Sequence, residues 1–494
     1  MSVPILTLLI LFPLLAALIT ALLPRDNMRL IKGWAFVAVA IEFGLSLYML
    51  ANFVPNTSQM QFVEFYPWVP QFGISYHVGV DGLSFWLVIL TTFLMLIAIP
   101  ASFSEINVRV KEYFIFFLIL ESALLGVFVA LDLFLFYVFW EFSLIPMALI
   151  IGIWGHEQRI YAAVKFILFT MAGSLLMLVA ILVLYFATGA RSFDLLELQK
   201  TIVPANLQPW LFAAFALAFA IKVPMFPVHT WLPDAHVQAP AAGSIILAGV
   251  LLKLGAYGFM RYNLTLFPDA SQQFAPILVV LAIIGIIYGA MTAAVQKDLK
   301  ALIAYSSVTH MGFIILGIFV FSQQALSGAI LQMVNHGIST GALFLMVGLL
   351  YERRHTHLIT EFGGLQKVIP VFGFFFLFVM FSSMGLPGLN GFVGEFLVLL
   401  GSWETNPAYA AVAAVGVILA AIYLLWAYQR VMQGPVTNEK NKTLPDLNRR
   451  ELALLVVMAA LIVLIGIFPD YLLNPMQASV TQLLHFDAVA GLVK

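Results

Sequence analysis

The 494-residue sequence contains no cysteine and very little charge. Without cysteine, the chain can form no disulfide, no thiolate metal site and no cysteine-held iron–sulfur cluster. Only 10% of its residues are charged, whereas soluble domains carry about 25%. The formal net charge of −1 also gives no basic surface of the kind that nucleic-acid-binding proteins use. An ordinary soluble protein and a nucleic-acid partner are therefore both excluded.

Long apolar stretches dominate the sequence, because 63% of its residues are hydrophobic and the mean hydropathy is +1.03. A membrane-spanning helix needs about 20 mostly apolar residues. The first stretch has no positive residues before it and is longer than the core of a signal peptide, so it is predicted to be a retained span. The sequence thus predicts an all-α polytopic membrane protein, one membrane domain over 1–494. Its fourteen predicted spans are 3–23, 31–54, 83–104, 113–131, 133–154, 161–188, 208–230, 239–261, 275–295, 300–321, 324–351, 370–402, 408–430 and 451–469.

The positive residues between the spans predict the orientation. Sixteen Lys and Arg residues follow odd-numbered spans, and only four follow even-numbered ones. Because positive loops stay on the cytoplasmic or matrix side, both termini are expected on the outer face. The expected location is a bacterial plasma membrane or an equivalent energy-transducing inner membrane. The four residues assigned to the outer side are Arg191, Lys200, Arg261 and Lys494.

Seven charged residues fall inside apolar spans. A charge at mid-membrane costs about 3 kcal/mol or more, and such residues usually face the bundle interior and mark an ion path. The alternative is a set of structural salt bridges, but seven charges in one chain, together with His310 and His336, favour the ion path. The seven are Lys165, Lys222, Lys253, Glu42, Glu121, Glu141 and Glu395.

Glu141 in FYVFWEFSLIP and Lys222 in LAFAIKVPMFP are the candidates for a proton switch. Dehydration favours the neutral form of a lysine, whereas a nearby carboxylate stabilises its ammonium form. Separating such a pair would release a proton, and closing it would retain one. That the two residues face each other is a hypothesis at this point.

Spans 7 and 12 are predicted to be discontinuous, because proline and glycine interrupt them in KVPMFPVHTWLP and SSMGLPGLNGFVGE. Paired breaks in two halves of a chain indicate a transporter site at mid-membrane. The alternative is that proline and glycine are simply common in membrane helices. The five-span separation predicts two five-helix repeats, helices 4–8 and 9–13. The predicted parts are 1–111 (helices 1–3), 112–262 and 275–432 (the repeats), and 451–494 (helix 14 and a short tail).

Four segments of the sequence resemble one known family, the antiporter-like subunits of respiratory complex I, and most closely their M type. They are KVPMFPVHTWLPDAHVQAPAAGSIILAGVLLKLGAYGFMR, QKDLKALIAYSSVTHMGF, FWEFSLIPM and GLPGLNGFVGEF. The resemblance covers roughly residues 75–470. It implies fourteen helices with two inverted five-helix repeats. It also implies proton translocation that is driven by quinone reduction in partner subunits.

The resemblance also implies a proton relay. Glu141 and Lys222 resemble the gating pair, Lys253 the lysine that links the half-channels, and Glu395 the outlet residue. Sister chains of the L, N and Mrp types tend to carry Lys at the position of Glu395, so its carboxylate favours the M type. Glu42 and Glu121 match no relay position. Further positions that match the polar axis are Lys165, His310 and His336.

The chain has no nucleotide motif and no cofactor ligand set. The resemblance therefore implies that NAD(H) or another donor, FMN, iron–sulfur clusters and quinone bind partner subunits. The expected partners are L-type and N-type chains and the peripheral redox arm. Asp234, His229 and His236 are close in sequence but show no metal-ligand spacing, so no metal is expected. The absence of a long amphipathic helix after the last span argues against an L-type chain.

Other functions remain open at the level of the sequence. One is a cation/proton antiporter subunit of the Mrp type, against which Glu395 speaks. Another is the equivalent subunit of a ferredoxin- or hydrogenase-linked relative, and a third is a purely structural role. The sequence leaves open the electron donor and quinone, the proton stoichiometry, the order of transfer and the host.

Overall fold

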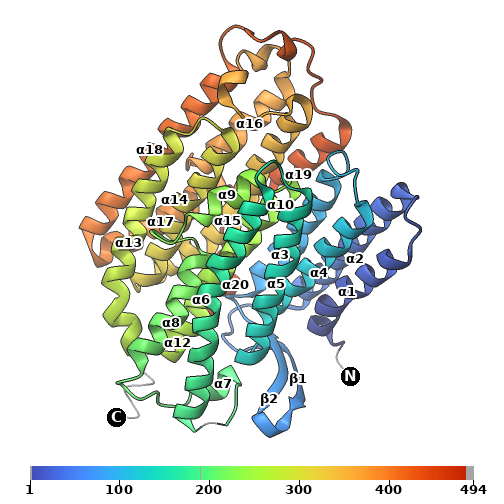
Figure 1. The fold of residues 1–494 in the computed structure, drawn as a ribbon. Helices are drawn as coiled ribbons and strands as arrows, with labels where there is room; N and C mark the ends of the chain where they lie inside the picture. Colours follow the sequence, from blue (N-terminus) through green and yellow to red (C-terminus); the bar gives the residue numbers. More distant parts are fainter. Residues whose placement is uncertain (1–2, 190, 486–494) are drawn as a thin grey trace.

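A bundle of long apolar helices with one small β-hairpin makes up the fold (Figure 1). The computed structural model describes residues 3–189 and 191–485, so Lys494 lies outside the described residues. Within them, eleven helices are long and apolar enough to cross a membrane, and three shorter apolar helices occupy the other predicted positions. The prediction of a polytopic helical membrane protein is confirmed, and the helices are consistent with fourteen spans.

The N-terminal part contains three helices and the hairpin. Residues 55–82, which the sequence analysis treated as a loop, include two antiparallel strands joined through η1 (Pro70–Phe72). The hairpin lies at the bottom of Figure 1. The elements are α1 (Ile5–Leu22), α2 (Met28–Asn52), β1 (Gln61–Val69), β2 (Ile74–Val80) and α3 (Phe85–Ala101).

The part of the chain predicted as the first repeat contains a broken helix at the predicted place. Pro224 and Pro227 follow the end of α8, and because proline has no N–H to donate, the helix stops there and resumes at α9. The next span, 241–266, contains two π-helical segments, η2 and η3. The elements are α4 (Val110–Val129), α5 (Leu133–Trp154), α6 (Arg159–Thr188), α7 (Leu195–Leu198), α8 (Gln208–Lys222), α9 (Trp231–Gln238), α10 (Ala241–Ile246), η2 (Leu247–Leu251), α11 (Leu252–Gly258), η3 (Phe259–Asn263) and α12 (Leu264–Leu266).

The part of the chain predicted as the second repeat is broken between α16 and α17. Gly385 and Gly388 there have φ of 78° and 93°, a left-handed conformation that glycine adopts without a steric penalty. The elements from residue 268 to the end of the described chain, which include the last helices beyond the predicted repeat, are α13 (Pro268–Ala294), α14 (Leu299–Phe319), α15 (Gln323–Arg354), η4 (Ile359–Glu361), η5 (Leu365–Lys367), α16 (Pro370–Ser383), α17 (Asn390–Thr405), α18 (Pro407–Met432), η6 (Glu439–Asn441), α19 (Arg449–Ile467) and α20 (Asp470–Leu484).

The last helix, α20, corrects the prediction that residues 470–494 form only a short tail. Over residues 470–484 the chain is helical and packs against α15. The N–H of Gly82 donates to Ser479 Oγ (3.0 Å), and Trp86 Nε1 donates to the carbonyl of Leu472 (3.0 Å). These bonds attach the helix to the start of α3.

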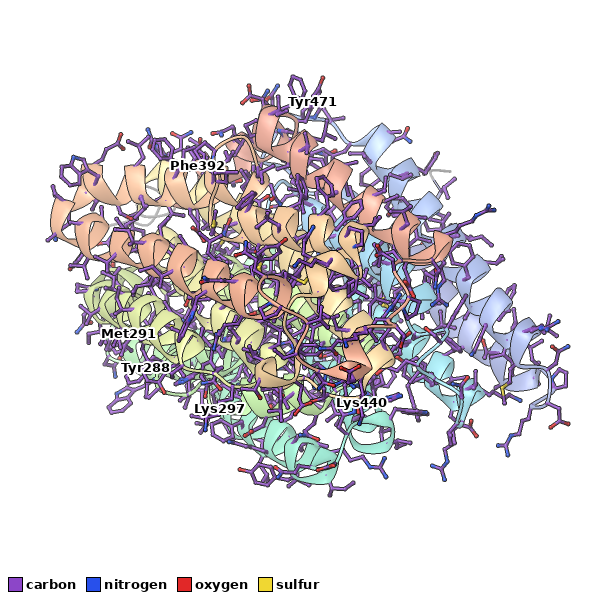
Figure 2. All side chains as sticks on the ribbon, turned by 90° about the horizontal axis from the view of Figure 1, so that it is seen from above. Tyr288, Met291, Lys297, Phe392, Lys440 and Tyr471 are labelled. Atoms are coloured by element: carbon purple, nitrogen blue, oxygen red, sulfur yellow. The ribbon has the colours of Figure 1, made fainter. Side chains whose placement is uncertain are left out.

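The bundle has a protein-surrounded centre and a lipid-exposed periphery. The most apolar 18 residues of span 241–266 and those of α15 are all buried inside the molecule. In α19 only 28% of the corresponding residues are buried. Seen from above, side chains fill the space between the helices, and the exposed Tyr471 lies at the edge (Figure 2). Polar residues on the two central helices are therefore shielded from lipid.

The two ends of the bundle differ in charge. We call the end with the loops after α3, α5, α13, α15 and α18 the basic side, and the end with the hairpin the opposite side. Two residues that the sequence analysis counted in loops are in fact buried. Lys300 lies within α14 at 1% exposure, and Arg261 lies within η3, where it pairs with Asp81.

Candidate functional site

The first helix break carries a buried lysine without a hydrogen-bond partner. Lys222 is the last residue of α8, and its ammonium lies 5.4 Å from the ring centre of Trp140 and 5.6 Å from that of Phe166. Aromatic faces attract a cation without taking its protons, unlike a carboxylate. The aromatic contacts therefore hold the ammonium group but leave its protons free.

Glu141, which follows Trp140 on α5, interacts with Lys222 electrostatically. In the part of the chain that the structure describes, neither Lys222 Nζ nor Glu141 Oε1 has a hydrogen-bond partner. The two groups are thus attracted to each other without a bond between them. Since Coulomb energy in a low-dielectric interior changes steeply with distance, a small movement of either helix would alter their attraction strongly.

Beside this break, Lys165 of α6 forms an ion pair with Asp234 of α9 at 2.6 Å. The sequence analysis placed Lys165 in the relay and did not foresee this partner. Both side chains are partly exposed, so the pair joins α6 to the second half of the broken helix at its rim. The relay role of Lys165 stays a prediction.

The three residues considered above for a metal contact different neighbours. Asp234 binds Lys165, His236 stacks on Phe344 with ring centres 4.4 Å apart, and His229 packs near Tyr288. Among the described residues, no group of three His, Cys, Asp or Glu side chains could hold a metal ion. Asp234, His236 and His229 therefore do not share one site in the structure.

At the centre of the molecule, Lys253 of α11 contacts His336 of α15. Its Nζ lies 2.6 Å from His336 Nδ1 and donates to the carbonyl of Ala248 (2.5 Å), which belongs to the π-helical segment η2. The ring centres of His336 and His310 lie 5.6 Å apart. All three side chains are buried. Titratable groups thus follow one another from α11 through α15 to α14.

At the second helix break, Glu395 of α17 lies in a hydrogen-bonded network. Its Oε1 lies 2.7 Å from His310 Nδ1 and accepts from Gln332 Nε2 (3.0 Å). Asn335 Nδ2 donates to the carbonyl of Asn390 (2.7 Å), the first residue of α17. These hydrogen bonds therefore connect Glu395 and the start of α17 to α14 and α15.

The structure brings six of the seven predicted site residues into two groups. Glu141 and Lys222 form the first group. The second group is a chain of contacts, Lys253–His336–His310–Glu395. Sequence reasoning missed Gln332, Asn335 and Asp234. The first two had a detectable signal, because Gln332, Asn335, His336 and Ser339 follow the i, i+3, i+4, i+7 spacing that puts polar residues on one face of a helix.

Glu42 and Glu121 lie apart from these groups. They are on α2 and α4, both are fully buried, and none of their four carboxyl oxygens has a hydrogen-bond partner among the described residues. They influence each other electrostatically. Neither contacts a predicted relay residue through a hydrogen bond or ion pair that the structure describes, so both remain without an assigned role.

Comparison with known proteins identifies the family. Residues 130–422 match the family model described as NADH:quinone oxidoreductase/Mrp antiporter, TM. The chain is 45% identical to NADH-quinone oxidoreductase subunit M of Rickettsia prowazekii over 98% of this chain and 99% of that one. It thus matches this relative over nearly its whole length.

Two solved structures share the fold. A chain of respiratory complex I from Thermus thermophilus with bound NADH superposes with a TM-score of 0.88 at 33% identity, covering 97% of this chain and 99% of that chain. A chain of the Mrp complex from Dietzia sp. DQ12-45-1b has a TM-score of 0.85 at 21% identity, covering 99% of this chain and 100% of that chain. The Mrp likeness concerns the fold alone. The chain belongs to the family of NADH-quinone oxidoreductase M subunits, the antiporter-like membrane chains of respiratory complex I.

Proposed function

We propose that this chain translocates protons as the M-type membrane-arm subunit of a complex I. The observations that carry the proposal are the Glu141–Lys222 pair at the first helix break and the chain of buried titratable side chains that runs from Lys253 to Glu395 at the second. The redox chemistry belongs to partner subunits, which bind NADH or another donor, FMN, iron–sulfur clusters and quinone. Other antiporter-like chains of the L and N types are its expected neighbours in the membrane arm.

The proposed relay starts at the first break. When Glu141 moves away from Lys222, the buried ammonium group loses its stabilising charge and gives up a proton to water on the basic side, and the amine takes one back when the pair closes. Because α8 and α11 pack together, that change also alters the electrostatic field at Lys253. A proton then passes from Lys253 to His336 along their contact, on to His310, and finally to Glu395.

The basic side is proposed to be the cytoplasmic side, since positive loops remain there. Protons would then enter from the basic side and leave on the opposite side, near the second break. The driving force reaches this chain through packed helices, as a displacement that opens or closes the Glu141–Lys222 pair.

The experiment is donor-driven proton pumping in native membrane vesicles that carry Glu141→Ala. We expect pumping to fall by at least about tenfold while the complex still assembles, because one positioned proton-transfer group typically contributes about 100-fold or more. Glu112→Gln is the matched control, because Glu112 is a partly exposed acid of α4 that pairs with Arg25. Full pumping in Glu141→Ala would remove Glu141 from the relay.

The Mrp-type alternative makes a different prediction for the same vesicles. A gradient-driven cation/proton antiporter subunit would transport protons in response to sodium and without an electron donor. Proton uptake that requires the donor and does not respond to sodium supports the complex I assignment.

A further inference from the structure

A cavity of about 860 Å³ opens on the basic side, next to the link between α9 and α10. Its lining includes side chains from α5, α15 and the connections that follow α3 and α5. None of them belongs to the relay described above. The titratable residues among them include Glu105, His156, Tyr351, Glu352 and His355.

Glu105 connects this cavity to the interior. It lies in the loop after α3, and its two carboxylate oxygens accept from the N–H of Ala241 at 3.1 and 3.3 Å. Burial raises the pKa of Glu105 to about 7, although the nearby Lys300 ammonium and the Ala241 N–H oppose the rise. Both protonation states of this carboxyl group are therefore accessible near neutral pH.

Lys300 lies on the inner side of the same link. It is the second residue of α14, and its Nζ donates to the carbonyl of Ala239. Ala239 and Ala241 stand at either side of Pro240, between the end of α9 and the start of α10. Glu105 and Lys300 thus bind the same short link, one at each end, and interact electrostatically across it.

His236 lies beyond the link, on α9. The described residues offer no hydrogen-bond partner to either of its ring nitrogens, although the side chain is fully buried. A buried imidazole without partners is costly, so its presence calls for an explanation. The ring interacts electrostatically with both Lys300 and Lys253. The ring is therefore within electrostatic range of both the buried lysine at the link and the central lysine of the relay.

We propose that Glu105, Lys300 and His236 form a proton inlet from the basic side that loads Lys253. The proposal rests on the proposed function and deepens it. In this arrangement the Glu141–Lys222 pair controls whether Lys253 is protonated, and the inlet supplies the protons. A proton taken up by the Glu105 carboxylate passes to the neutral amine of Lys300, then to the imidazole of His236, and then to the neutral amine of Lys253. Each group releases one proton for each that it accepts.

Other groups face Glu105 and set its environment. Lys300 comes from α14, Tyr351 and Glu352 from α15, and Tyr113 from α4. Lys300 is the cation among them. Removing the charge of Lys300 would therefore alter the electrostatic environment of the Glu105 carboxyl group more than any change to the two tyrosines.

The test uses native membranes in which the whole complex is assembled. Glu105→Gln keeps the shape of the side chain and can still accept from Ala241, but it cannot carry a proton. We expect donor-driven pumping per assembled complex to fall by at least about tenfold, with Glu112→Gln unchanged. Wild-type pumping by Glu105→Gln would overturn the inlet.

Lys300→Arg separates proton transfer from structural support. Arginine keeps the positive charge and can donate to the Ala239 carbonyl, yet it stays protonated in proteins. The inlet predicts that Lys300→Arg assembles and pumps as poorly as Glu105→Gln. Rescue of pumping by arginine would assign Lys300 a structural role and overturn the proposal.

Failure of the inlet and failure of the proposed function give different results. If Glu141→Ala loses pumping while Glu105→Gln retains it, only the inlet is wrong. If both variants pump like the wild type, the proton-translocating role of this chain is wrong.

Discussion

The two helix breaks hold their charged residues in opposite ways. At the first break, Lys222 is surrounded by aromatic rings and has no hydrogen-bond partner among the described residues. At the second break, Glu395 is bonded to His310 and Gln332. Each break carries a buried charge. The charge at the first break has no hydrogen-bond partner among the described residues, whereas the charge at the second break is hydrogen-bonded.

This difference separates a switch from a holding site. A buried charge without a bonded partner responds strongly to any approaching charge, because the low-dielectric interior screens it weakly. A charge that is hydrogen-bonded to its neighbours is held in place, and moving it requires that those hydrogen bonds break together. We infer that the first break senses the movement of neighbouring helices and that the second retains the proton until its release.

The largest effect is expected from removing the hydrogen-bonded carboxylate at the second helix break. Glu395→Gln keeps the size of the side chain but removes the carboxylate that pairs with His310. Because the amide cannot take up a proton near neutral pH, donor-driven pumping should fall by at least about tenfold. The measurement is pumping per assembled complex in native vesicles. Retained pumping would mean that the second break does not carry the proton.

A smaller effect is expected at the rim of the first helix break. Asp234→Asn removes the ion pair with Lys165, whose side chains are 21% (Lys165) and 39% (Asp234) exposed. Partly exposed pairs contribute at most about 1 kcal/mol, so pumping should change by no more than about fivefold. Vesicle pumping and the thermal stability of the purified complex measure this effect. A complete loss of pumping would place the Lys165–Asp234 pair in the relay itself.

The smallest effect is expected outside both breaks. Glu42 and Glu121 lack hydrogen-bond partners, as Lys222 does, but the structure gives neither a contact with the relay. The double variant Glu42→Gln, Glu121→Gln should therefore assemble and pump like the wild type. A marked loss of pumping would show that the lack of a bonded partner marks a relay group even away from the breaks.

The spans and breaks could be predicted because they depend on local properties. Apolar length fixes a membrane helix, and the prolines after Lys222 stop α8 whatever surrounds them. The contact of Glu395 with His310 could not be predicted in the same way. It depends on how α14 and α17 are rotated against each other, and side chains from the whole bundle decide that rotation.

Two further errors have physical causes. The hairpin was missed because only apolar stretches long enough to cross a membrane were marked, although the alternation in ISYHVGV is typical of a strand. Lys300 was counted in a loop because a charge at the start of an apolar span usually reaches water. Here the link between α9 and α10 covers it, through a contact between residues 61 positions apart in sequence. The inlet residues were therefore visible only in the folded chain.

Lys222→Arg tests the central claim most directly. Arginine keeps the charge and the aromatic contacts but cannot release a proton, so a switch that works by proton release should stop. We expect a complex that assembles and reduces quinone when uncoupled, with pumping lowered by at least about tenfold. Wild-type pumping by this variant would show that Lys222 need not deprotonate and would contradict the account.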